Sequence, residues 1–289
     1  METQRGCPYT CAYCNSPSNN STYTDDKAGR FYRKKTMKRA HEELTFLCKK
    51  YQPELIYFVV DTFLAMGDPE FLELANMYMD FKIPFWMNTR AETITPMRAE
   101  WLEKMNMLRM NLGIEHGNAE YREKFLHRKL PNERMLQAFQ DVAGRKFTTV
   151  GNSIIGMPEE TRELAFDTVR FNRSLPKEIE TTGAFIFAPY HGTALRETAI
   201  RQGYLDPESI CSLNSLEGSM LTKMPKFPKD EVLGLERTFS FYVDFPESVW
   251  PEIRKAEAMT PEGDKAFERL QQKYLSDFMG AGQLAPIEA

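Results

Sequence analysis

The sequence predicts an α/β protein: a partial (β/α)6 barrel of parallel strands, followed by a mainly helical C-terminal region. Short apolar segments alternate with amphipathic ones through about residue 204, and the alternation then stops. Alternating strands and helices form parallel βαβ units with right-handed connections. Strands that are apolar throughout belong to sheets covered on both faces. An open, doubly wound sheet is the alternative architecture.

Five segments are predicted as strands because they are short, mainly apolar and rich in β-branched or aromatic residues. They are residues 55–60, 84–88, 108–114, 147–155 and 181–187. Residues 1–5 are expected to supply the end of one strand before them, which makes about six β/α units.

Helices are predicted between these strands, where apolar residues recur with a helical period. They span 36–50, 69–81, 96–105, a stretch reaching about residue 144 with a break near Pro131, and 160–173. The polar segment 16–27 contains Pro, Asn and Asp and is predicted as a loop.

We expect a boundary after residue 204, with residues 1–204 forming the barrel and residues 205–289 a mainly helical region. Residues 205–228 lack any period and are predicted to be rich in loops. Helices are predicted at 229–244, 249–258 and 262–279. This region either covers the open side of the barrel or supports it by packing.

Composition excludes several classes of function. The chain has 289 residues and a formal net charge of −4, so no basic excess is present to neutralise nucleic-acid phosphates. No segment approaches the roughly 20 apolar residues of a membrane helix. The N-terminus has no apolar signal-peptide core. We therefore expect a cytoplasmic protein that contacts neither nucleic acid nor membrane.

Three of the five cysteines, Cys7, Cys11 and Cys14, fall within eight residues. A C-x3-C-x2-C spacing lets three thiolates reach one iron–sulfur cube, leaving one iron without a protein ligand and open to a small molecule. Zinc is the alternative, but structural zinc usually takes four ligands and no second cysteine pair is present. Cys48 and Cys211 are expected to be small buried hydrophobes.

Polar side chains and glycines follow the predicted strands. They are Asp61, Asn88 with Arg90, Glu115, Gly156 with Glu159, and Pro189 with His191. Sites of parallel α/β folds lie at the carboxyl ends of the strands. The cysteine loop would follow the first strand, so we expect it at the same edge.

The cysteine motif CPYTCAYC resembles the cluster motif of the radical S-adenosylmethionine (radical SAM) superfamily. Over residues 1–200 the chain also resembles the cobalamin-binding branch, which includes methyltransferases and magnesium-protoporphyrin monomethyl ester cyclases. The similar segments are VDTF at 60–63, GIEHG at 113–117, IIGMPEET at 154–161 and PYHGT at 189–193, where His191 replaces a proline.

This resemblance implies the partial barrel of that family, with a [4Fe–4S] cluster on Cys7, Cys11 and Cys14 and S-adenosylmethionine on the open iron. It also implies a small-molecule substrate and a reductant such as flavodoxin or ferredoxin. The rival function is a non-catalytic iron–sulfur or zinc protein that uses the cysteines for electron transfer or structure.

The residues at the strand ends are the predicted holders of S-adenosylmethionine. Asp61 would accept from its ammonium group, a charge-assisted bond, and Arg90 would pair with its carboxylate. Glu115 would accept from the ribose, and Gly156 would let the adenine approach the backbone. Each residue also has an ordinary structural explanation, as a cap, a turn or a surface ion pair.

Two further predictions concern Glu159 and His191. Glu159 is either an adenosine contact or a helix acid favoured by the dipole. His191 is the candidate for a substrate or proton-transfer role.

Cobalamin is expected only through a domain outside these residues, because the D-x-H-x-x-G motif of cobalamin-binding domains is absent from this sequence. The chain is thus either the catalytic half of a longer protein or an enzyme that works without cobalamin. The substrate is not predicted.

Overall fold

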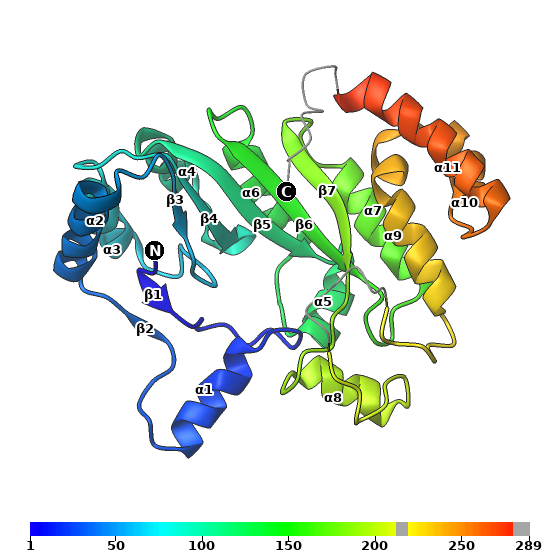
Figure 1. Ribbon diagram of the computed structural model, residues 1–289, viewed down its shortest axis with the longest axis horizontal. Helices are drawn as coiled ribbons and strands as arrows, with labels where there is room; N and C mark the ends of the chain where they lie inside the picture. The colour runs from blue at the N-terminus through cyan, green and yellow to red at the C-terminus, as the bar shows by residue number, and fades with distance from the viewer. Residues whose placement is uncertain (212–218, 280–289) are drawn as a thin grey trace.

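The computed structural model describes residues 1–211 and 219–279. Its centre is a five-stranded parallel sheet in the order β3-β4-β5-β6-β7. The strands are β3 (Ile56–Phe58), β4 (Phe85–Arg90), β5 (Met107–Glu115), β6 (Thr148–Ile155) and β7 (Ile179–Ile186). The sheet is curved and its edge strands β3 and β7 do not pair with each other (Figure 1). The predicted α/β class with a parallel sheet is confirmed.

The expected sixth strand is reduced to the pairing of one residue. The amino group of Met1 donates to Tyr57 O at 2.7 Å, and Val59 N donates to Met1 O at 2.9 Å. These two bonds are those that a parallel neighbour makes. The chain then leaves the sheet, and β1 (Gln4–Arg5) pairs antiparallel with β2 (Arg33–Lys34).

Helices connect the strands as predicted. They are α2 (Met37–Tyr51), α3 (Asp68–Tyr78), α4 (Pro96–Lys104), α5 (Ala119–Leu126), α6 (Asn132–Val142) and α7 (Arg162–Arg173), with a short 3-10 turn at Ala91–Thr93. Side-chain N-caps begin four of them, at Thr36, Thr95, Asn118 and Thr161. The expected break near Pro131 separates α5 from α6, where His127 takes a left-handed backbone conformation.

The prediction of a loop at 16–27 is wrong, because α1 (Ser16–Asp25) is a helix. Two of its polar side chains anchor it to the cysteine loop. Ser16 Oγ accepts from Cys7 N at 2.9 Å, and Asn20 Nδ2 donates to Cys7 O at 3.2 Å. Asn20 Oδ1 also accepts from Tyr32 N at 3.3 Å. Tertiary contacts therefore override a composition with no apolar period.

A helix that was not predicted, α8 (Ala194–Arg201), follows β7. Thr193 caps its first turn by accepting from Arg196 N. The buried Arg196 side chain donates to Pro189 O at 3.0 Å and to Ser209 O at 2.7 Å. Those bonds fix the segments on both sides of the helix.

The C-terminal region is helical, as expected. It contains α9 (Lys229–Asp244), a 3-10 turn (Glu247–Val249), α10 (Trp250–Ala256), α11 (Pro261–Tyr274) and a π-helical turn (Leu275–Met279). Residues 205–211 and 219–228 form neither helix nor strand, and 212–218 lie outside the described residues.

Helix α9 lies beside α7 and packs on β7, which continues the outer layer of helices (Figure 1). One buried apolar cluster contains Leu195 of α8 together with Leu235 and Phe239 of α9. The boundary after residue 204 stays a prediction, because this cluster draws on both sides of it.

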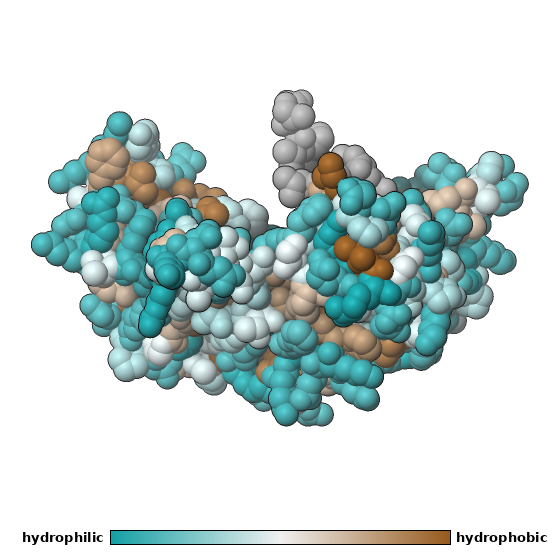
Figure 2. Space-filling view, turned by 90° about the horizontal axis from the view of Figure 1, so that it is seen from below, coloured by the Kyte–Doolittle hydropathy of each residue, from teal (hydrophilic) through white to brown (hydrophobic). Residues whose placement is uncertain are grey.

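The surface seen from below in Figure 1 is mainly hydrophilic, with apolar groups in small patches (Figure 2). Among residues 1–211 and 219–279, no helix has the length and apolar character needed to cross a membrane.

Candidate active site

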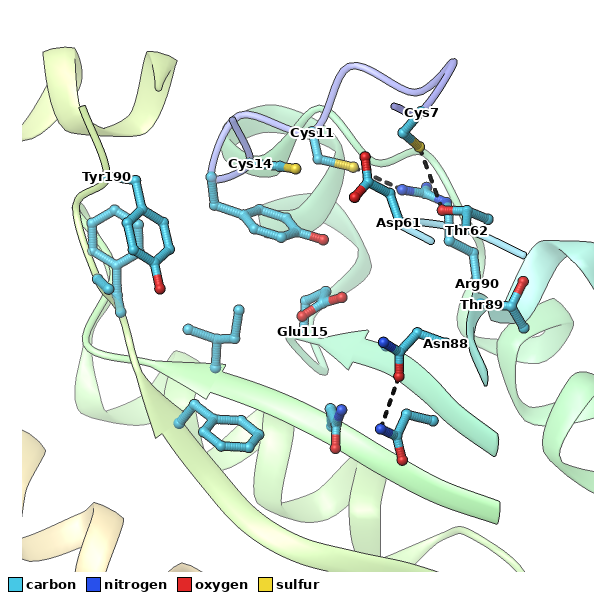
Figure 3. A pocket seen from close by; sticks show the side chains of 18 of the residues that line it. Cys7, Cys11, Cys14, Asp61, Thr62, Asn88, Thr89, Arg90, Glu115 and Tyr190 are labelled. Atoms are coloured by element: carbon cyan, nitrogen blue, oxygen red, sulfur yellow. Dashed lines mark hydrogen bonds between the residues drawn. The ribbon is translucent and has the colours of Figure 1, made fainter. Parts of the chain in front are cut away.

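The three clustered cysteines lie on the loop between β1 and α1 and face one cavity. Cys7 and Cys11 are buried and Cys14 is half-buried. The cavity has a volume of about 430 Å³ and opens beside the carboxyl ends of the strands. Its other lining residues include Asp61, Asn88, Arg90, Asn111, Glu115, Asn152, Phe185 and Tyr190. In Figure 3 the cysteines line one side of the cavity and Glu115 and Asn88 face it from the sheet.

Each sulfur lies within hydrogen-bonding distance of a polar partner. Arg90 Nη1 donates to Cys11 Sγ at 2.7 Å, and Ser16 N donates to Cys14 Sγ at 3.4 Å. Cys7 Sγ lies 3.4 Å from Thr62 Oγ1. Burial raises the pKa of Cys7 and raises the pKa of Cys14 to about 11. Both thiols are therefore protonated at neutral pH until a bound metal displaces the protons.

These sulfurs fit an iron–sulfur cluster better than a single metal ion. No group of three or more His, Cys, Asp or Glu in the described chain is arranged to hold one ion. The side-chain donors that the cysteine loop presents to the cavity include three thiols, and hydrogen bonds to sulfur tune the potential of iron–sulfur clusters. The cavity beside them leaves space for a ligand, whereas a structural zinc site is closed by four protein ligands.

Asp61 supplies a carboxylate to this cavity. It follows β3, is exposed and lines the cavity with the cysteines. Within the described residues, no side-chain hydrogen bond or ion pair involves it. It is therefore free to accept bonds from a cationic ligand, as predicted for the ammonium of S-adenosylmethionine.

Arg90, Glu92, Arg128 and Glu115 form a chain of opposite charges, which we call the rim network. Arg90 Nε donates to Glu92 Oε1 at 2.8 Å, and its guanidinium lies 4.0 Å from the ring centre of Tyr9. The fully buried Arg128 donates to Glu92 at 3.2 Å and to Glu115 at 3.3 Å. The predicted residues Arg90 and Glu115 are thus linked by Glu92 and Arg128, which the sequence interpretation missed.

The pKa values of the two acids in the rim network are shifted in opposite directions. Burial opposes ionisation of Glu92, but Arg128 and then Arg90 outweigh it, so the pKa of Glu92 is lowered. Burial raises the pKa of Glu115, and Arg128 offsets only part of that effect.

Gly113 makes room for the Glu115 carboxylate. A Cβ at Gly113 would clash with Glu115 Oε1 and would lie 3.4 Å from Arg128 Nη1. Glu115 itself takes a left-handed backbone with φ +65°, which costs a non-glycine residue free energy. The strand end is therefore shaped to turn this carboxylate toward Arg128.

Three predicted site residues do not line the cavity. Gly156 faces the outer layer, where a Cβ would lie 2.7 Å from Val232 of α9. Glu159 accepts from the Tyr204 hydroxyl at 3.3 Å. His191 O accepts from Asn15 Nδ2 at 2.7 Å, and its Nε2 lies 3.5 Å from Cys211 N. Their predicted roles stay predictions.

Glu160, the neighbour of Glu159, carries the contacts in this loop. Its buried Oε2 accepts from Gly156 N at 2.6 Å and from Met157 N at 3.0 Å. Its Oε1 lies 3.2 Å from Nε2 of the buried His116. His116 lies in the GIEHG segment and Glu160 lies in the IIGMPEET segment. The resemblance of these two segments to the family was the sequence signal that could have identified the pair.

Comparisons with known proteins bear on this arrangement. A family model described as the radical SAM superfamily matches residues 1–171. An uncharacterised methyltransferase of Pyrococcus horikoshii is 26% identical over 244 residues, which are 83% of this chain and 50% of that protein. The chain thus spans about half the length of the curated relative it matches.

Two solved structures share the fold. The cobalamin-dependent S-adenosylmethionine radical enzyme OxsB, with aqua-cobalamin bound, has a TM-score of 0.61 at 11% identity, covering 95% of this chain and 45% of that one. The radical S-adenosylmethionine methyltransferase TsrM of Kitasatospora setae, with cobalamin and a [4Fe–4S] cluster bound, has a TM-score of 0.58 at 14% identity, covering 94% and 60%.

Proposed function

We propose that this chain, which belongs to the radical SAM superfamily, is the catalytic part of an enzyme. The enzyme would cleave S-adenosylmethionine reductively in the cavity beside Cys7, Cys11 and Cys14. The observation that carries the proposal is the convergence of three thiols and the Asp61 carboxylate on one cavity. A protein that only carries a cluster needs no such carboxylate.

Cys7, Cys11 and Cys14 would each hold one iron of a [4Fe–4S] cluster. When bound, this cluster supplies the electron that breaks a carbon–sulfur bond of S-adenosylmethionine. An external donor such as flavodoxin or ferredoxin would provide that electron. The N–H groups of Arg90 and Ser16 already point at two of the sulfurs and would stabilise their thiolate form.

Asp61, Arg90 and Glu115 would hold the three polar parts of S-adenosylmethionine. The unpaired Asp61 carboxylate accepts from the ammonium. Arg90, fixed by Glu92 and by the ring of Tyr9, presents a guanidinium to the carboxylate. Glu115, held by its bond from Arg128, accepts from the ribose hydroxyls.

Methylation of the substrate is one outcome that the curated relative supports, since it is named a methyltransferase. The two structural neighbours are described with cobalamin bound or as cobalamin-dependent. In this chain, cobalamin would have to be supplied from outside the 289 residues, because they lack D-x-H-x-x-G. Cyclisation and rearrangement are the other radical modifications open to the same cavity.

The test is anaerobic reconstitution with iron and sulfide, followed by dithionite and S-adenosylmethionine. We expect a brown protein with about four irons per chain and release of 5′-deoxyadenosine, or of S-adenosylhomocysteine if methyl transfer occurs. Cys14→Ala should release neither product, whereas Cys48→Ser should match the unmodified protein. Stoichiometric zinc without charge-transfer absorption would contradict the proposal.

A further inference from the structure

A row of neutral polar side chains crosses the concave face of the sheet. Asn111 Nδ2 donates to Asn88 Oδ1 at 2.9 Å, and Asn88 Nδ2 donates to the Tyr57 hydroxyl at 3.0 Å. The three residues come from β5, β4 and β3, and Asn88 is the direct register partner of Asn111. We call them the amide row. Figure 3 shows Asn88 and its bond on the sheet side of the cavity.

The amide row has free hydrogen-bonding groups at both ends. The Tyr57 oxygen accepts from Asn88, so its own O–H remains to donate, and Asn111 Oδ1 remains to accept. Asn152 of β6, opposite Gly113 in register, lines the same cavity, and its side chain has no partner in residues 1–211 and 219–279. Neutral polar groups that face a cavity without partners favour a ligand that satisfies them.

This row lies deeper in the sheet than the residues proposed to hold S-adenosylmethionine. Asn111 precedes Glu115 by four residues on β5, which is about 13 Å along a strand. Asn88 precedes Arg90 by two residues on β4. A second cavity, of about 660 Å³, shares Cys14, Asp61 and Asn88 with the first and is also lined by Tyr57. The amide row thus joins two connected spaces below the cysteine loop.

The space around the amide row is lined by apolar side chains and by the Asp61 carboxylate, which would repel an anion. The cations that line the two cavities, Arg90 and Arg5, are paired with Glu92 and Glu2. Phe185 of β7 lines the first cavity with half of its surface exposed. In Figure 3, Tyr190 stands on the opposite side of the cavity from Asn88. This wall suits an apolar or aromatic body rather than an anionic one.

We infer that the amide row and Asn152 recognise the substrate, and that the substrate presents a neutral amide-type edge with adjacent N–H and C=O groups on an apolar body. The N–H of the substrate donates to Asn111 Oδ1 or Asn152 Oδ1. The C=O of the substrate accepts from the Tyr57 hydroxyl or from an asparagine amide. The apolar body contacts Phe185 and Tyr190. This inference rests on the proposed function, since it assigns the substrate side of the same cavity.

The test uses the reconstituted protein with S-adenosylmethionine and three probes of similar shape, followed by saturation-transfer NMR. Benzamide has the amide edge, N,N-dimethylbenzamide lacks the donor, and benzoate is an anion. We expect benzamide to bind, and each of the other two to bind about five-fold more weakly or worse, because one neutral hydrogen bond is lost or a charge is left unpaired. Equal binding of all three probes, or no binding of benzamide, overturns the inference.

Variants separate the amide row from the cofactor site. Asn111→Leu should weaken benzamide binding about five-fold or more, and Tyr57→Phe about three-fold, at unchanged iron content. Asn76→Leu, on the exposed face of α3, is the matched control and should change nothing. Benzamide binding that is unchanged in both row variants overturns the inference.

A separate measurement follows affinity for S-adenosylmethionine by electron paramagnetic resonance of the reduced cluster. It should be the same in Asn111→Leu and the unmodified protein. A parallel loss of S-adenosylmethionine affinity would assign the row to the cofactor and also overturns the inference. Failure of the proposed function itself is distinguishable, because the unmodified protein would then release no product from S-adenosylmethionine.

Discussion

The rim network and the amide row both have members on strands β4 and β5 but differ in chemistry. On β4 and at its end, the rim network has Arg90 and Glu92, whereas the amide row has Asn88 only two residues earlier. On β5, Glu115 with its buried partner Arg128 replaces the neutral Asn111. Moving a few residues along the strand therefore changes a charged surface into a neutral one. A ligand that spans both must have an ionic end and a neutral end, or two ligands must meet there.

The largest effect is expected at the cysteines, one of which accepts a hydrogen bond from Arg90 of the rim network. Cys7→Ala, Cys11→Ala or Cys14→Ala should abolish the cluster, because each thiolate would hold a distinct iron. Iron content and visible absorption after reconstitution are the measurements. Full iron content in any one of these variants would show that a different ligand set holds the metal.

The matched variants are Cys48→Ser and Cys211→Ser, which should keep the full iron content. Iron loss in the Cys48 variant would reveal a fourth ligand and remove the open iron. A stability loss of roughly 1 kcal/mol in either variant would reflect packing alone.

Glu92→Gln should destabilise the fold by about 3 kcal/mol, because it leaves the fully buried Arg128 with Glu115 as its remaining carboxylate partner. Denaturant unfolding of the protein measures the loss. Glu100→Gln is the control, since its pair with Lys104 is exposed to solvent and should contribute little to the free energy of unfolding. Similar losses in the two variants would show that the rim network is no more than a surface ion pair.

The pH dependence of stability should change in the same variant. The folded-state pKa of Glu92 lies below its unfolded value. Its stabilisation is therefore fully present above an unfolded pKa of about 4.3 and is lost as the pH falls through the folded pKa. Glu92→Gln should flatten this acid limb of the stability curve. An unchanged acid limb would place the titrating group elsewhere.

Asp61→Ala should weaken S-adenosylmethionine binding roughly ten-fold while iron content stays unchanged, because one charge-assisted hydrogen bond is lost. Titration followed by electron paramagnetic resonance of the reduced cluster measures it. Glu115→Ala should act in the same direction but less strongly, since ribose hydroxyls are neutral donors. Unchanged affinity in both variants would remove them from the cofactor site.

The smallest effect is expected in the amide row. Asn88→Leu breaks two hydrogen bonds between partly exposed neutral groups, so the free energy of unfolding should fall by about 1 kcal/mol or less. A loss as large as that of Glu92→Gln would mean that the row is built for stability rather than for recognition.

The strand-end positions were predictable from sequence because hydrophobic segments stop abruptly there. This signal placed Asp61, Arg90 and Glu115 on the cavity with the cysteines. This signal did not identify Arg128, because that residue follows a helix and contacts Glu92 and Glu115 only in the folded chain. The same holds for α1, whose polar sequence becomes helical through its bonds to Cys7 and Tyr32.

Gly156 shows the limit of the same signal. A glycine with positive φ at a strand end indicates that the backbone needs space, but not on which side. Here the neighbour is Val232 of α9, a residue 76 positions further along the chain. Asn111 was not predicted as a site residue. A single asparagine within a strand is not informative until its cross-strand partner, here Asn88, is known.

The buried Glu160 has a consequence for the time scale on which its loop opens. The Gly156 and Met157 amides donate to a carboxylate that is itself shielded from water and lies beside His116. Amide protons held this way exchange with solvent only when the surrounding structure unfolds. Although it is a loop, the turn after β6 is therefore expected to retain its amide protons as long as the central strands do.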